Sequence, residues 1–277
     1  MIKKLCLVFV VLFAFNSYAQ EGTSSPYSFY GVGSLKFKGT AENRSMGGIS
    51  VYADSIHANL RNPASFAGNN LVISPFNGES RPVKFTVGGG HASTNLKTST
   101  GSDKATATSF DYLAISFPIG KFGTTFGLIP YTSVGYKLEA TGMVADSIVT
   151  TNRYNGEGGV NRAFIGLGYQ VNKNLSIGVD ARYNFGKIEN SSIEFVFDDE
   201  GDPLQYQSRQ FDRSEVSGLS FNFGAYYTPM INERLQLTTS FTYSPKSEIT
   251  SNNERVFSTI VINPLTGQEF EINTIDA

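Results

Sequence analysis

The chain has 277 residues, a formal net charge of −2 and a single cysteine, Cys6. Because Cys6 lies inside an N-terminal apolar run, the rest of the chain excludes disulfides, iron–sulfur clusters and thiol catalysis. The charges form no basic block, so we expect no nucleic-acid partner.

The first predicted element is a secretory signal peptide over residues 1–20. Two lysines precede the apolar run 5–15, and the small residues Ser17 and Ala19 follow it near the expected cleavage point. The run is too short for a transmembrane helix, which needs about 20 apolar residues. We therefore expect an exported protein.

The second predicted element, residues 21–82, is a hatch or plug. It is rich in glycine and small residues, too apolar for a tail and too irregular for strands. Its segment "RNPASFAG", residues 61–68, contains an Asn-Pro pair that belongs neither in a helix nor in a central strand. Irregular backbone of this kind is tolerated at membrane depth inside a barrel lumen, where it is shielded from lipid.

Residues 83–277 are predicted to form antiparallel strands of a transmembrane β-barrel. In "LSIGVDARYNF", residues 175–185, every odd-numbered residue is apolar and none of the even-numbered residues is, which is the period of a strand. Further predicted strands lie at 83–89, 110–119, 124–138, 160–171, 216–227 and 235–245.

The predicted connections alternate between long and short. The long ones are 91–109, 139–159 and 187–215, and the short ones are 120–123, 172–174 and 229–234. This places all long loops at one end of the sheet, as in outer-membrane barrels. The strands of a secreted β-sandwich also alternate between apolar and polar residues. Here, however, the second face is made of small and polar residues, as in a water-filled lumen, and tyrosines lie near the strand ends, as in an aromatic girdle.

The strand count predicts an incomplete barrel, with about seven to eight strands present. After residue 245 we expect a fourth long loop containing a hairpin over 255–275, with turn residues at 263–267. An open barrel would expose unpaired backbone groups to lipid. We therefore expect that the sequence is a fragment.

The predicted hatch resembles the N-terminal hatch of the FadL-type outer-membrane transporters of long-chain fatty acids and other hydrophobic compounds. The resemblance covers roughly residues 25–245 and includes "SPYSFYGVGSL" (25–35) and "GLIPYTSVGY" (127–136). The residues that carry the hatch motif are Met46, Gly47, Gly48, Asp54, Asn62, Pro63, Ala64 and Phe66.

The resemblance implies a barrel of about 14 strands in the outer membrane of a Gram-negative bacterium. It also implies uptake of a hydrophobic small molecule, with sideways release into membrane lipid past a mobile hatch. An alternative of another class is a shuttle or docking barrel that binds protein partners in an outer-membrane secretion or assembly machine. A structural barrel is the third hypothesis. A continuous apolar pocket between hatch and lumen would favour uptake, whereas a lumen closed by polar side chains, together with large apolar outside loops, would favour docking. The predicted loops are polar, which weighs against docking of apolar partners and equally against an apolar capture groove.

The sequence offers no convincing catalytic or metal site, and we expect neither an enzyme nor a cofactor. His57 and His91 have no regularly spaced ligand partners, and the acidic run 198–202 misses the spacing of a calcium loop. A lipase-type site would need a histidine on a lipid-facing strand, and neither histidine is predicted there.

One polar cluster is predicted inside the lumen. Arg162, Asp180 and Arg182 fall on the hydrophilic face of neighbouring strands. Two interpretations stay open: an ion-pair cluster that supports the plug, or a polar path or carboxylate-binding site.

Overall fold

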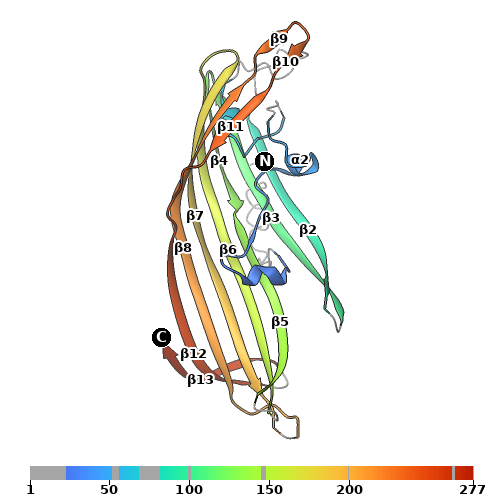
Figure 1. The fold of residues 1–277 in the computed structure, drawn as a ribbon. Coiled ribbons are helices and arrows are strands. Elements are labelled where there is room, and N and C mark those ends of the chain that lie inside the picture. Colours follow the sequence, from blue (N-terminus) through green and yellow to red (C-terminus); the bar gives the residue numbers. More distant parts are fainter. Residues whose placement is uncertain are drawn as a thin grey trace, which may run out of the picture.

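The computed structural model describes residues 23–51, 56–68, 82–98, 101–144, 148–198, 200–263 and 266–276. The predicted signal peptide and Asp54 of the hatch motif lie outside these residues. Figure 1 shows one long, curved antiparallel sheet, with the N-terminal segment running along its hollow side. Among the described residues, no helix has the length and apolar character needed to cross a bilayer.

The curved sheet, which we call the wall, is a continuous series of hydrogen-bonded antiparallel strands. Its order is β13-β12-β8-β7-β6-β4-β3-β2, with β5 and β11 as side branches. The strands are β2 (Lys84–Lys97), β3 (Ser102–Ile119), β4 (Phe122–Pro130), β5 (Thr132–Val144), β6 (Ile148–Gln170), β7 (Leu175–Val196), β8 (Gln207–Tyr227), β11 (Thr239–Tyr243), β12 (Thr250–Ile262) and β13 (Glu269–Asp276).

In two places, two successive strands occupy a single strand position of the sheet, which we call a stave. β4 and β5 pair with successive stretches of β6, and β11 and β12 pair with successive stretches of β8. The described wall therefore has seven staves plus β13, in agreement with the predicted seven to eight strands. The all-β antiparallel prediction is confirmed, and the described sheet is an open part of a barrel with β2 and β13 at its edges.

The burial pattern of β7 is inverted relative to that of a soluble protein. Ile177 and Tyr183 are each 47% exposed on the convex face, whereas Asn184 is fully buried on the concave face. The same convex face continues on the neighbouring strands with exposed Ile165, Leu167, Leu219, Phe221, Phe223 and Phe241. An apolar outer face over a polar inner face is typical of a transmembrane barrel wall.

The N-terminal segment contains only short elements. These are η1 (Pro26–Phe29), β1 (Ser34–Leu35), α2 (Ala41–Ser45) and η2 (Pro63–Phe66), and β1 pairs with β5. The Asn43 side chain accepts hydrogen bonds from the Thr40 amide and hydroxyl at the start of α2. The helix ends at Ser45 and is followed by a turn through Gly47 and Gly48, whose φ angles of 68° and 85° favour glycine.

The predicted long loops are wrong, because most of their residues are strand. β7 and β8 stay paired out to Glu194 and Ser208, and β6 and β7 stay paired out to Thr150 and Val196. Backbone hydrogen bonds continue whatever the side chains are. Where both faces of the sheet are polar, the sequence no longer alternates between apolar and polar residues, so a strand there cannot be recognised from its two-residue period.

In the C-terminal part of the chain, the predicted strand 235–245 is only partly formed, whereas the predicted hairpin 255–275 is present. Of the predicted strand 235–245, only β11 joins the wall, while β10 (Leu235–Gln236) forms a small hairpin with β9 (Met230–Asn232). The hairpin predicted over 255–275 is confirmed by the pairing of β12 with β13. β12 also pairs with β8, so it extends the seventh stave instead of lying in a loop.

Candidate functional site

The hatch rests on a row of glycines that crosses four strands of the wall. Gly123 on β4 lies opposite Gly168 on β6, which lies opposite Gly178 on β7, which lies opposite Gly224 on β8. A Cβ atom at Gly178 would lie 2.4 Å from the carbonyl carbon of Pro63. The row therefore lets irregular hatch backbone lie directly on the sheet.

The other glycines of this row are equally crowded by the hatch. A Cβ at Gly123 would lie 1.8 Å from the Phe66 carbonyl oxygen, and one at Gly224 would lie 2.0 Å from Asn62 Oδ1. A Cβ at Gly168 would lie 2.5 Å from the backbone nitrogen of Ala67. We call residues 62–67 the hatch anchor, because these contacts fix them to four adjacent strands.

The Asn62 side chain caps the 3₁₀ turn of the hatch anchor and also bonds the anchor to the wall. Its Oδ1 accepts the Ala64 N–H at 2.9 Å and caps η2. Its Nδ2 donates to the Ala225 carbonyl at 3.0 Å and to Ser240 Oγ at 2.7 Å. The asparagine before the proline thus satisfies strand groups of β8 and β11 while the proline starts the 3₁₀ turn.

Further contacts seal the anchor against the wall. Ser176 Oγ on β7 donates to the Ala64 carbonyl at 3.0 Å, and Ala64 is fully buried. Phe66 packs in an apolar cluster with Leu60 of the hatch and with Tyr112, Ala114, Ile129 and Phe164 of the wall. Small residues in "NPASFA" are therefore explained by close backbone packing.

The other hatch-motif residues lie next to the anchor. The turn Met46–Gly48 follows α2, and the Gly48 carbonyl accepts a 2.6 Å hydrogen bond from Arg61 Nη1. The Met-Gly-Gly turn is thus tied to Arg61, the residue that precedes the hatch anchor. Asp54, the remaining motif residue, lies outside the described residues.

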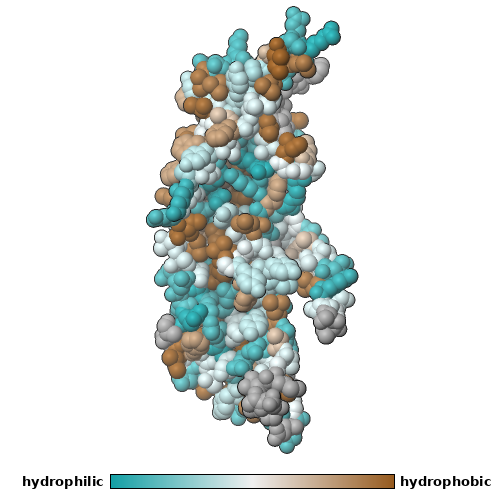
Figure 2. Space-filling model, in the orientation of Figure 1, coloured by the Kyte–Doolittle hydropathy of each residue, from teal (hydrophilic) through white to brown (hydrophobic). Residues whose placement is uncertain are grey.

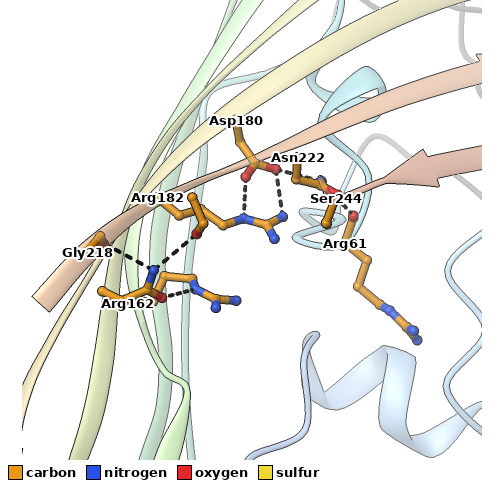
Figure 3. A network of polar contacts seen from close by, with 9 residues as sticks. Arg61, Arg162, Asp180, Arg182, Gly218, Asn222 and Ser244 are labelled. Atoms are coloured by element: carbon orange, nitrogen blue, oxygen red, sulfur yellow. Dashed lines mark hydrogen bonds and ion pairs between the residues drawn. The ribbon is translucent and has the colours of Figure 1, made fainter. Parts of the chain in front are cut away.

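The predicted lumen cluster contains a buried ion pair. Asp180 and Arg182, which are 3% and 6% exposed, form an ion pair through Arg182 Nε and a second contact from Nη2 at 2.9 Å. Asn222 Nδ2 donates to Asp180 Oδ2 at 2.9 Å, and its Oδ1 accepts from Ser244 Oγ at 2.8 Å. Figure 3 shows this network beside the Arg61 backbone of the hatch, whose carbonyl Asn222 Nδ2 approaches at 3.5 Å.

Arg162 belongs to a separate branch of the cluster. Its Nε donates to Asn184 Oδ1 at 2.8 Å, and its guanidinium lies 4.1 Å from the centre of the Tyr131 ring. Asn184 in turn donates to the Gly218 carbonyl and to Ser220 Oγ. The structure thus brings the three predicted residues to one region, but Arg162 bonds to an asparagine and not to Asp180.

A small cavity separates this cluster from the hatch. It measures about 40 Å³ and is lined by Lys36, Lys38, Arg162, Asp180 and Arg182 together with apolar residues of both elements. Burial, followed by the positive charge of Arg182, lowers the pKa of Lys38 to about 8. Four cationic side chains and one carboxylate therefore meet where hatch and wall join.

The described residues on the hollow side form a surface of mixed polarity. Figure 2 shows hydrophilic and hydrophobic residues mixed over the face that carries the hatch. Among the described residues, no three metal-ligand side chains gather in one place. His91 lies beside Thr108, and Asp198 Oδ1 accepts the Glu200 and Asp202 N–H groups in a turn.

Several residues of this site were not predicted from the sequence. The glycine row, Asn222, Ser244 and Lys38 all belong to it. Glycines at inner-facing positions of several strands were a visible signal. Their alignment into one row depends on strand register, which the sequence alone did not supply.

Comparisons with known proteins bear on the family and not on the site residues. No curated protein and no solved structure matches the chain. Nothing found supports the FadL-type family, so the predicted resemblance receives no support at that level. The family model described as BamG matches residues 1–277, the whole chain, and the chain therefore belongs to the BamG family.

Proposed function

We propose that this chain is the hatch-bearing part of an outer-membrane β-barrel that docks protein partners within the machinery assembling outer-membrane β-barrels. The observation that carries this proposal is the match of the BamG family to the entire chain. The family name points to that machinery in Gram-negative bacteria. This was the alternative to uptake of hydrophobic compounds.

The attachment of the hatch supports a docking role over a transport role. A hatch that opens for each substrate needs an interface of low local stability. Here the anchor lies directly on four glycines, with its backbone at three of them, and Asn62 and Ser176 add hydrogen bonds to the wall. An anchor of this kind suits a barrel that presents a fixed shape to partners.

The space between hatch and wall also argues against uptake of long acyl chains. Pockets for small organic ligands have volumes of roughly 300–1,000 Å³ and are mostly apolar. The cavity at the hatch–wall junction measures about 40 Å³ and has five charged side chains in its lining. A long-chain fatty acid does not fit there unless the hatch moves.

The outer face supports placement of the barrel in the outer membrane. Its exposed apolar residues would contact acyl chains, while the buried ion pair faces the hatch. The anchor sits near the short connections after β6 and β8, the end expected to face the periplasm. The hatch would therefore close the barrel at the periplasmic side.

The test is purification of the full-length protein from its own outer membrane under mild detergent, followed by quantitative mass spectrometry of proteins and lipids. We expect barrel-assembly proteins in stoichiometric amounts and no enriched fatty acid. Depletion of the protein should lower the amount of folded outer-membrane barrels and leave uptake of labelled oleate unchanged. Stoichiometric fatty acid with no protein partner would overturn the proposal.

A further inference from the structure

We propose that the cavity between hatch and wall is a binding site for an oxyanion, a phosphate or carboxylate group, held by Lys38 and Arg162. The inference concerns a ligand site and does not depend on the proposed docking role. It rests on three observations: the charge of the lining, the free donors that face the cavity, and the size of the cavity.

The lining carries an excess of positive charge. Lys36, Lys38, Arg162 and Arg182 face a single carboxylate, that of Asp180. Asp180 is already engaged by Arg182 and Asn222. An anion would balance the charge that remains, and partial burial would strengthen its attraction to the cations.

Two of these cations retain unused donors. Among the described residues, Lys38 Nζ has no hydrogen bond or ion pair, and burial beside three guanidinium groups lowers its pKa. Arg162 donates from Nε to Asn184, and it contacts Tyr131 both through a side-chain hydrogen bond and by lying over the ring. These contacts do not use all the N–H groups of a guanidinium. Arg162 and Lys38 both line the cavity. A guanidinium edge and an ammonium group together suit the oxygen atoms of a phosphate or carboxylate.

The size of the cavity fits a small ligand group. Its volume of about 40 Å³ exceeds the roughly 10–15 Å³ that a cavity needs in order to hold one water molecule. Leu60, Ile129 and Phe164 border the same cavity. The oxyanion can therefore be a free ion, or the head group of a lipid whose apolar part continues along this side.

The experiment uses the full-length protein in detergent and follows its thermal unfolding by circular dichroism. Inorganic phosphate, acetate and sodium chloride are compared at equal ionic strength. Dihexanoyl phosphatidate, kept below its micelle concentration, tests a lipid head group. The variant is Lys38→Gln, and the matched control is Lys97→Gln, which changes an exposed lysine near the end of β2.

We expect saturable stabilisation by phosphate or acetate beyond that of chloride, and binding about tenfold weaker in Lys38→Gln but unchanged in Lys97→Gln. A second variant, Arg162→Lys, keeps the charge and should weaken binding less than Arg162→Gln. Stabilisation by phosphatidate alone assigns the site to a lipid head group. The proposal fails if no oxyanion exceeds chloride, or if Lys38→Gln binds like the unchanged protein.

Discussion

Gly178 on β7 lies directly opposite Gly224 on β8, and a Cβ atom at either position would lie within 2.9 Å of an atom of Pro63. This pair forms the centre of the glycine row under the hatch anchor. A side chain at Gly178 would occupy the space that the Pro63 and Ala64 backbone now fills, and one at Gly224 the space of the Asn62 side chain and the Pro63 ring. The absence of side chains at these glycines therefore gives the hatch anchor room to pack against the wall.

Replacement of Gly178 by alanine should loosen the hatch. The added Cβ would lie 2.4 Å from the Pro63 carbonyl carbon and 2.5 Å from the Ala64 nitrogen. Overpacking of this kind costs about 1–3 kcal/mol, so we expect faster tryptic cleavage after Lys38 and Arg44. The control Gly142→Ala adds a Cβ that meets nothing within 4 Å. Equal cleavage rates in the two variants would show that the glycine row does not hold the hatch anchor in place.

Replacement of Asn62 by alanine should weaken the same anchor through lost hydrogen bonds. Asn62 caps η2 and donates to the Ala225 carbonyl and Ser240 Oγ. Leaving buried partners unsatisfied costs about 1–3 kcal/mol. We expect a lower melting temperature by circular dichroism, whereas Asn252→Ala, at an exposed site on β12, should change it little. A melting temperature unaffected in Asn62→Ala would show that these bonds do not hold the hatch.

The buried ion pair and an exposed ion pair of the same spacing provide a matched comparison. Asp180→Asn leaves Arg182 buried without its carboxylate, which should cost about 3–5 kcal/mol. Glu215→Gln breaks the exposed pair with Arg213 and should cost about 0.2–1 kcal/mol. Urea unfolding in detergent measures both, and similar losses would mean that water reaches Asp180.

Lys38 should make stability depend on pH in the alkaline range. Its pKa is about 8 in the folded protein and 10.5 in the ordinary, unfolded case. The unfolded chain therefore holds the proton more tightly, and stability should rise as the pH increases from about 8 to 10.5. The charged groups that act on Lys38 are Arg182, Asp180, Arg162 and Arg61.

The measurement for Lys38 is the melting temperature as a function of pH, compared with Lys38→Gln. The variant should lack the rise between pH 8 and 10.5 and should be the more stable protein below pH 8. Lys97→Gln should follow the unchanged protein. A bound oxyanion should suppress the rise, because it would keep Lys38 protonated. Identical curves for Lys38→Gln and the unchanged protein would rule out the altered pKa.

Some structural expectations succeeded because they depend on local pattern. The alternation in residues 175–185 predicted β7, and burial confirmed it, with Ile177 outside and Asp180 inside. The loops failed for the opposite reason. Residues 187–196 have no consistent apolar face, yet they continue β7 through backbone bonds to β6 and β8.

By itself, the sequence determined the all-β wall with its apolar outer face, since side-chain alternation follows from strand geometry alone. It also placed an irregular, small-residue segment before that wall. Only the tertiary structure decided where this segment rests and which charges meet. Gly123, Gly168, Gly178 and Gly224 are far apart in the chain and form one row only through strand register. The physical reason is that register depends on pairing between distant strands, and a shift of one residue would turn these glycines away from the hatch.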